Sequence, residues 1–256
     1  MTARPAEAAP RDSAPAGTGA PGVRTDAAQE WLRAIVALFV TVLITSNFTA
    51  AKLITVGGLT LPAAVILFPI SYIIGDVLTE VYGYAAARRA IWLGFACNAI
   101  VIGVTWASIT LPPAGAWTLP TLASTAESQR AYAAVLGMAP RIVVASLLAY
   151  LAGEFLNSAV LAKLKIATAG RYLWVRTIGS TLVGQFADSL IFIGVAFAGL
   201  VPGRVLGLMI VAQWLVKSGI EAAATPVTYL VVGRLKRVVG VDRFDRGVSL
   251  NPLRLR

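Results

Sequence analysis

Six apolar segments follow one another along this chain, each close to the ~20 residues that a helix needs to cross a bilayer. Composition supports that interpretation, because 57% of the residues are hydrophobic and 13% are charged, whereas soluble domains average about 45–50% and about 25%. We therefore expect an all-α polytopic membrane protein with six transmembrane helices. The predicted segments are 31–56, 61–81, 90–111, 132–161, 177–200 and 205–232.

The chain outside these segments is polar and divides the protein into three parts. Residues 1–30 are rich in Ala, Pro, Gly and Arg without apolar periodicity, which predicts a disordered tail. Residues 31–233 form the predicted transmembrane domain, and residues 234–256 form a basic tail. Pro140 supplies a breaking point near the start of the long fourth segment.

Basic residues are enriched in every second loop, and this pattern predicts the orientation of the protein in the membrane. One side carries most of them, whereas the loops of the other side carry only Arg130 and Arg204. Because cytoplasmic loops are enriched in Lys and Arg, both termini are predicted to lie in the cytoplasm, with the protein in the cytoplasmic (inner) membrane. This pattern accounts for the net charge of +10 without a nucleic-acid partner. The basic loop residues of the predicted inner side are Arg88, Arg89, Lys163, Lys165, Arg171 and Arg176.

Several kinds of chemistry are excluded by what the sequence lacks. The chain has no histidine and a single cysteine, Cys97, so Ser-His and Cys-His catalysis and HExxH metal sites are absent. No GxxxxGK[ST] phosphate loop occurs, so the chain has no ATPase motif of its own. We expect no enzyme activity, cofactor or metal; an intramembrane enzyme would need an all-carboxylate or metal mechanism, and the six apolar segments contain no D-x-x-D cluster for it.

Eight charged residues nevertheless fall inside the predicted segments. Each costs of order 2.5–3.5 kcal/mol on insertion scales, so together they require an interior polar network, a water-filled cavity, or both. They are Asp76, Glu80, Glu154, Asp188, Glu221, Lys52, Arg141 and Lys217.

Structural explanations compete with functional ones for most of these charges. Lys217 and Glu221 are four residues apart, so an intrahelical ion pair is as good an interpretation as a substrate role. We expect Glu80 to be solvated at the inner interface and Lys52 to extend outward along its stem. Asp188 lies half-way through its segment, where it needs a cation or donors, and a functional role is favoured there.

A set of short motifs is spread over residues 31–236. The later motifs include Arg176-Thr177, Gly184-Gln-Phe-Ala-Asp188 and Lys217. The earlier ones are Ser46-Asn47, Lys52, Phe68-Pro69, Asp76, Glu80-Val-Tyr-Gly83, Ala87-Arg-Arg89, Arg141, Ala149-Tyr150, Gly153-Glu154 and Asn157. Together these motifs resemble those of the queuosine-precursor transporter family, also called the "putative vitamin uptake transporter" family.

This resemblance implies an importer of 7-cyano-7-deazaguanine and 7-aminomethyl-7-deazaguanine, salvaged for tRNA modification. It also implies a fold similar to the substrate-binding subunits of energy-coupling-factor vitamin importers. Secondary transport is expected, and the alternative is a membrane subunit that binds its substrate for an ATP-driven vitamin or nucleobase importer. A homo-oligomer or an energising partner is left open.

A guanine-like edge offers paired N–H donors, which a carboxylate accepts well, and its carbonyl needs a donor. The expected substrate-binding residues are Asn47, Glu154, Gln185, Asp188, Lys217 and Phe192. The expected gate or structural charge network is Asp76, Glu80, Arg141, Asn157, Arg176 and Glu221.

Overall fold

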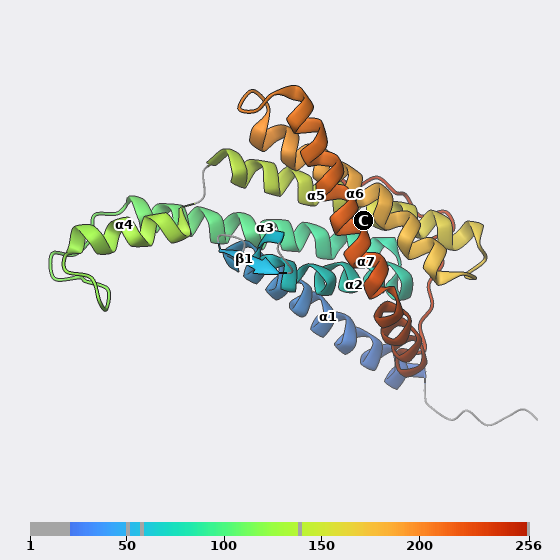
Figure 1. Cartoon of the computed structure of the whole chain (residues 1–256). Coiled ribbons are helices and arrows are strands. Elements are labelled where there is room, and N and C mark those ends of the chain that lie inside the picture. The colour runs from blue at the N-terminus through green and yellow to red at the C-terminus, as the bar shows by residue number, and fades with distance from the viewer. Residues whose placement is uncertain (1–20, 50–51, 57–58, 138–139, 255–256) are drawn as a thin grey trace, which may run out of the picture.

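The computed structural model describes residues 21–49, 52–56, 59–137 and 140–254 as a set of long helices with short connecting elements (Figure 1). In Figure 1 α3 runs across the molecule between α1 and α5. The long helices are α1 (Pro21–Thr49), α3 (Tyr84–Thr110), α5 (Pro140–Ala167), α6 (Leu173–Phe197) and α7 (Gly203–Val239). The shorter elements are β1 (Leu53–Val56), β2 (Leu59–Pro62), the 3₁₀ turn η1 (Ala63–Ile66), α2 (Phe68–Val77), the π turn η2 (Leu78–Tyr82) and α4 (Thr125–Leu136).

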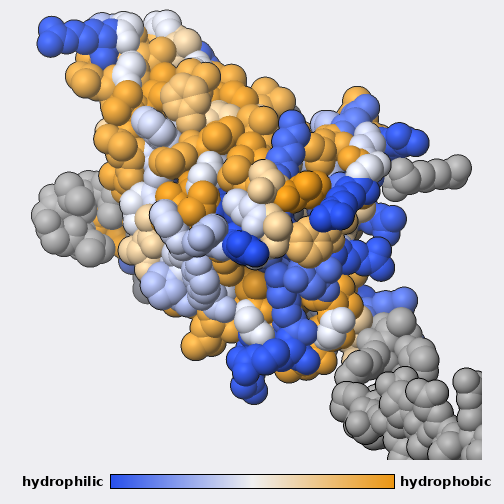
Figure 2. Space-filling view, turned by 90° about the vertical axis from the view of Figure 1, so that its right-hand side faces the viewer, coloured by the Kyte–Doolittle hydropathy of each residue, from blue (hydrophilic) through white to orange (hydrophobic). Residues whose placement is uncertain are grey.

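Five helical stretches of the described chain are long and apolar enough to cross a membrane. Large apolar side chains such as Ile100, Val104 and Leu230 are more than 60% exposed, as expected for surfaces that contact lipid. Figure 2 shows broad hydrophobic areas on one face of the molecule, with hydrophilic residues gathered beside them. The chain is therefore a polytopic, mainly helical membrane protein. Four of the stretches are Asp26–Thr49, Tyr84–Thr110, Leu173–Phe197 and Gly203–Val239, and the fifth, Thr125–Ala167, comprises α4 and α5, with residues 138–139 between them outside the described residues.

The structure corrects the end of the first predicted segment and the whole of the second. α1 ends at Thr49 rather than at residue 56, and a β-hairpin follows in which Leu53 pairs with Pro62 and Val56 with Leu59. The sequence between the strands is Gly57-Gly58, a typical hairpin dipeptide. The helical part of the second segment then begins at Phe68 and ends with η2, so it is shorter than the ~20 residues of a span.

The fourth predicted segment is divided at the expected proline. α4 ends at Leu136 and α5 begins at Pro140, because proline fits the first turn of a helix but not its interior. α4 has a capping box of its own: the Glu127 amide donates to the Ser124 hydroxyl at 3.2 Å, and the Ala123 amide donates to the Glu127 carboxylate at 3.0 Å.

Both predicted tails are partly structured. α1 begins at Pro21, inside the segment 1–30, and residues 1–20 lie outside the described residues. The C-terminal segment after α7 packs along the start of α3. There the Arg88 guanidinium donates to the carbonyls of Ser249 and Asn251, each at 3.0 Å, and the Trp92 indole donates to the Pro252 carbonyl at 2.8 Å.

Glycines allow α5 and α6 to pack closely in the middle of the molecule. A Cβ atom at Gly153 would lie 2.9 Å from the Cβ atom of Asp188, and one at Gly184 would lie 2.8 Å from the Cβ atom of Asn157. Small residues at such positions let membrane helices approach each other. The close approach places Glu154 and Asn157 of α5 beside Gln185 and Asp188 of α6.

Candidate functional site

Three buried carboxylates from three different helices form what we call the carboxylate cluster: Asp76 of α2, Glu154 of α5 and Glu221 of α7. Their exposed fractions are 2%, 5% and 6%, and their like charges act on one another. Every salt bridge among the described residues involves Glu80, Asp188 or Asp242 instead. The cluster therefore concentrates negative charge without a paired cation from the described chain.

Neutral donors satisfy the cluster only in part. Asn157 donates to Asp76 Oδ1 at 3.0 Å, and Glu221 accepts from the Thr181 hydroxyl at 2.5 Å and from Gln185 Nε2 at 3.2 Å. Glu154 Oε2 is buried without a hydrogen-bond partner, as are Asn157 Oδ1 and Gln185 Oε1. The site thus presents several unused acceptor atoms.

Glu154 occupies space that the neighbouring helix leaves open. Its Oε2 atom would lie 3.1 Å from a Cβ atom at Gly75 of α2. On the same helix Tyr72 hydrogen-bonds to Gln185 and lies within range of the charges of Glu154 and Glu221. α2 is therefore short, but it contributes both an acid and an aromatic ring to the interior.

Asp188 and Lys217 form an ion pair between α6 and α7. Lys217 Nζ donates to Asp188 Oδ2, and the two side chains are 17% and 14% exposed, respectively. The interpretation of Lys217 and Glu221 as an intrahelical pair is therefore wrong. The lysine reaches across to the facing helix, and Glu221 bonds to Thr181 and Gln185 of α6.

A second group of charges, the inner charge network, surrounds Glu80 on η2. Glu80 Oε1 lies 2.7 Å from Arg176 Nη2, 2.7 Å from Lys236 Nζ and 3.7 Å from Lys165 Nζ. Lys165 also donates to the Glu80 carbonyl, and Asp242 lies 2.6 Å from Lys165 and 2.9 Å from Lys236. Glu80 is fully buried, so the expectation that it is solvated at the interface is wrong.

Asp242 lies at the exposed edge of this network and interacts with two of its lysines. Burial alone would raise the pKa of its carboxyl, but the hydrogen bonds and charges of Lys165 and Lys236 outweigh that effect and hold the pKa below its ordinary value. The side chain is 45% exposed, and it follows the end of α7. The C-terminal segment therefore supplies an acid to a network built mainly by α5, α6, α7 and η2.

Some predicted site residues lie in other contacts. Asn47 donates to Asn98 of α3 at 2.5 Å, and Phe192 packs against Phe197 with ring centroids 6.4 Å apart. Arg141 donates to the carbonyls of Val195 at 2.5 Å and Ala198 at 2.6 Å, so it caps the end of α6. By contrast, Glu154 is a member of the carboxylate cluster, and Gln185 donates to Glu221 of that cluster.

Lys165, Lys236 and Asp242 were not predicted as members of any charge group. The positions of Lys165 and Lys236 outside the apolar segments suggested only membrane orientation, and no spacing in the sequence links these lysines or Asp242 to Glu80. The bond of Thr181 to Glu221 depends likewise on how α6 faces α7. Contacts between helices decide these partners.

Long apolar helices around a buried acidic interior define a polytopic membrane protein of the kind that handles polar solutes. The chain belongs to the family described as "putative vitamin uptake transporter", whose model matches residues 62–231. It is 31% identical over 185 residues, covering 72% of this chain and 77% of the relative, to the "probable queuosine precursor transporter" of Bacillus subtilis. These matches confirm the family indicated by the sequence motifs.

No solved structure matches the chain. The expected similarity to the substrate-binding subunits of energy-coupling-factor importers therefore stays a prediction.

Proposed function

We propose that the protein imports queuosine precursors, 7-cyano-7-deazaguanine and 7-aminomethyl-7-deazaguanine, across the cytoplasmic membrane for tRNA modification. The observation that carries this proposal is the carboxylate cluster together with the unused acceptor atoms beside it. The name of the Bacillus subtilis relative supports the same substrate class.

The chemistry of the interior suits a guanine-like base. Adjacent N–H donors on such a base fit a carboxylate as a bidentate pair, and Glu154 Oε2 is a buried acceptor without a partner. Asp188 already accepts from Lys217. We therefore propose that the N–H edge of the base binds Glu154, and that the Asp188–Lys217 pair lies next to the bound base. The ammonium of the aminomethyl base would also compensate part of the cluster's charge.

The same cluster supports secondary transport driven by protons. Acids in a low-dielectric interior need a cation or a proton, so loading and release of protons can alternate with loading and release of the base. In this proposal both termini lie in the cytoplasm, and the inner charge network closes the cytoplasmic side. The alternative, a subunit of an ATP-driven importer, would place the energy source on a separate protein.

Uptake of each base by a strain unable to make queuosine precursors tests the proposal. We expect uptake that collapses when the proton-motive force is removed, and that is lost in Asp188→Asn and Glu154→Gln proteins that insert normally. Glu127→Gln on α4 is the matched control, because Glu127 is exposed and lies outside the cluster. Absence of uptake, or conversion of the base to a new product, would refute import, whereas uptake that needs ATP but no proton gradient would favour the alternative.

A further inference from the structure

A groove that opens to the surface lies between α1 and α3, near the start of α3. Its cavity volume is about 120 Å³, close to the ~150 Å³ of an engineered apolar cavity that binds benzene. The space is therefore large enough for several methylene groups of a hydrocarbon chain. We call it the α1–α3 groove, and its lining residues are Leu32, Val36, Ala86, Arg89, Ala90 and Leu93.

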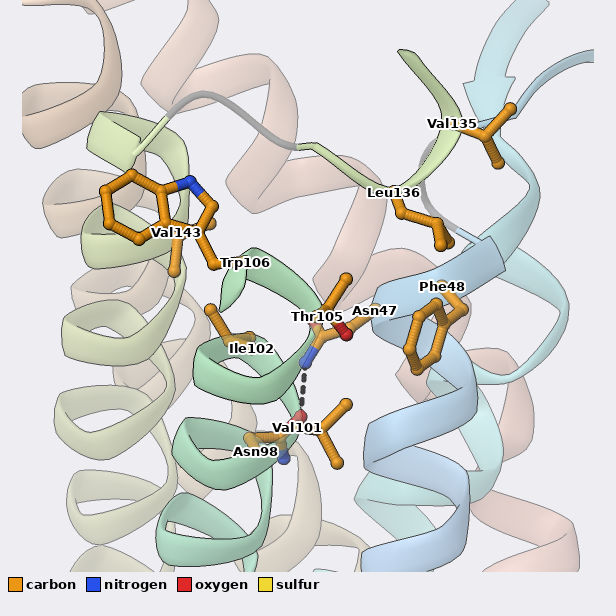
Figure 3. A pocket seen from close by; sticks show the side chains of 10 residues that line it. All are labelled: Asn47, Phe48, Asn98, Val101, Ile102, Thr105, Trp106, Val135, Leu136 and Val143. Atoms are coloured by element: carbon orange, nitrogen blue, oxygen red, sulfur yellow. Dashed lines mark hydrogen bonds between the residues drawn. The ribbon is translucent and has the colours of Figure 1, made fainter. Parts of the chain in front are cut away.

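Beyond this groove the two helices pack closely together. A Cβ atom at Gly94 would lie 2.8 Å from Cδ1 of Leu43 and 3.7 Å from the ring of Phe39. Further along, Asn47 Nδ2 donates to Asn98 Oδ1 at 2.5 Å, as Figure 3 shows. The pocket in Figure 3 beside this amide pair has a cavity volume of only about 50 Å³ and no charged lining residue. The α1–α3 groove is larger and has an arginine in its wall.

The groove opens onto the lipid-facing side of α3. Leu93, Ile100 and Val104 are all exposed and follow Arg89 at helical spacing, so these four residues share one face. Large apolar side chains exposed on a membrane helix contact lipid, and Arg89 therefore stands at the end of a lipid-facing stripe. Arginine at such an end extends its apolar stem along the hydrocarbon and its guanidinium toward the headgroups.

The two neighbouring arginines of α3 differ in what they bind. Arg88 is 3% exposed and donates to the carbonyls of Ser249 and Asn251, so its role is structural. Arg89 is exposed, and within the described chain it forms no hydrogen bond or ion pair. None of the residues that line the groove is acidic. The groove thus combines apolar walls with a cation that has no anion from the described residues.

We propose that the α1–α3 groove binds an anionic phospholipid, with the phosphate on the Arg89 guanidinium and part of one acyl chain along Leu32, Val36 and Leu93. A guanidinium binds phosphate oxygens through paired hydrogen bonds. A small anion would leave the apolar walls uncovered, and a zwitterionic lipid would bring a second cation toward Arg89. Basic pockets between membrane helices on the cytoplasmic side bind anionic headgroups in this way, and Arg89 lies on the predicted inner side. The site does not depend on which solute the protein carries.

Lipid binding by the purified protein tests the site. The protein in detergent is titrated with phosphatidylglycerol or with phosphatidylcholine of the same acyl chains, and native mass spectrometry counts the bound lipids. We expect phosphatidylglycerol to bind about fivefold more tightly, the factor contributed by one basic residue near an anionic headgroup. Arg89→Gln should abolish this preference. Arg171→Gln is the matched control, because Arg171 is also exposed on the predicted inner side but lies outside the groove, and it should keep the preference.

Filling the groove gives an independent measurement. Ala86→Leu should weaken binding of both lipids, because it occupies the space of the acyl chain, whereas Gly103→Leu, where nothing lies within 4 Å of an added Cβ atom, should leave binding unchanged. Glycerol phosphate, which has the anion without the chains, should not compete at equal concentration.

Equal binding of the two lipids, or a phosphatidylglycerol preference that survives Arg89→Gln, would overturn the lipid site. A lipid-independent dimer that Ala86→Leu disrupts would also overturn it, by showing that a second copy of the chain covers the groove. Because every readout is lipid binding or oligomeric state, absence of uptake would refute the proposed import function and leave this inference standing.

Discussion

Asp76 and Glu80 are four residues apart on the α2–η2 segment and equally buried, yet their surroundings are opposite. Glu80 has three cations within 4 Å of Oε1. Asp76 accepts a hydrogen bond from the neutral amide of Asn157 and lies near the acids Glu154 and Glu221. One turn of chain thus separates a neutralised acid from an acid that still needs a positive partner.

The comparison indicates different roles for the two regions. A buried acid with matched cations holds the surrounding helices together, because removal of one partner leaves the others as uncompensated buried charges. A buried acid without such partners can take up a proton or a cationic ligand, because that uptake lowers its electrostatic cost. We therefore assign structural closure to the inner charge network and exchange chemistry to the carboxylate cluster.

The largest effect on stability is expected from Glu80→Gln. The change removes the carboxylate that Lys165, Arg176 and Lys236 share, and breaking a buried ion pair in this way costs about 3–5 kcal/mol. Unfolding of the purified protein in detergent, followed by heat or denaturant, measures the loss.

Asp76→Asn is the matched variant for that measurement. Asparagine keeps an acceptor oxygen for Asn157 and removes a negative charge from the cluster, so its unfolding free energy should stay within about 1 kcal/mol of the original. Equal destabilisation by the two changes would show that the regions do not differ in the proposed way.

The next prediction concerns transport without loss of stability. Glu154→Gln and Glu221→Gln each remove an acid that has no salt bridge in the described chain, so the fold should tolerate them, while uptake of a 7-deazaguanine should fall at least about tenfold, or ~1.4 kcal/mol. Initial uptake rates and thermal unfolding would be measured on the same preparations. Normal uptake together with normal stability would remove both acids from the proposed transport site.

The Asp188–Lys217 pair predicts a specific rescue. Lys217→Ala should impair uptake and stability because Asp188 loses its cation, and Asp188→Asn in the same protein should restore part of the stability. Coupling between contacting residues is about 0.5–3 kcal/mol in double-mutant cycles. Glu221→Ala should not rescue Lys217→Ala, because Glu221 bonds to Thr181 and Gln185; rescue by Glu221→Ala alone would point back to an intrahelical pair.

Apolar segment length predicted most of the fold, and it failed where length alone was insufficient. The long helices and the break at Pro140 follow from hydropathy and from the chemistry of proline. The hairpin after Thr49 was missed because its residues are as apolar as those of a span, and only the strand pairing of Leu53 with Pro62 distinguishes them. The length of the helix at α2 was overestimated for the same reason, because the apolar residues before it belong to the hairpin and the 3₁₀ turn.

The candidate site was predictable by residue type but not by partner. Buried charge identified Glu154, Asp188 and Glu221, because a bilayer penalises such groups. Their partners depend on how the helices are rotated and on the close approach of α5 and α6 at Gly153 and Gly184. The spacing of residues along the sequence does not determine either. The i, i+4 rule therefore paired Lys217 with the wrong acid.

The smallest predicted effect comes from Asp242, at the exposed edge of the inner charge network. Its pKa is lower in the folded protein than in the unfolded chain, because Lys165 and Lys236 outweigh the effect of burial. The carboxylate therefore contributes stability that is present above the unfolded pKa of about 4, and this contribution is lost as pH falls through the folded pKa.

Asp242→Asn should then destabilise the protein at pH 7 by less than about 1 kcal/mol, since an ion pair with a half-exposed partner is screened by solvent. The difference from the unaltered protein should shrink as pH falls below the unfolded pKa and vanish once pH lies below the lowered folded pKa, where both forms are neutral at this position. Asp26→Asn, at an exposed position on α1, provides the baseline. A difference that is constant from pH 3 to pH 7 would mean that Asp242 acts through its shape and hydrogen bonds, and the edge of the network would then not be electrostatic.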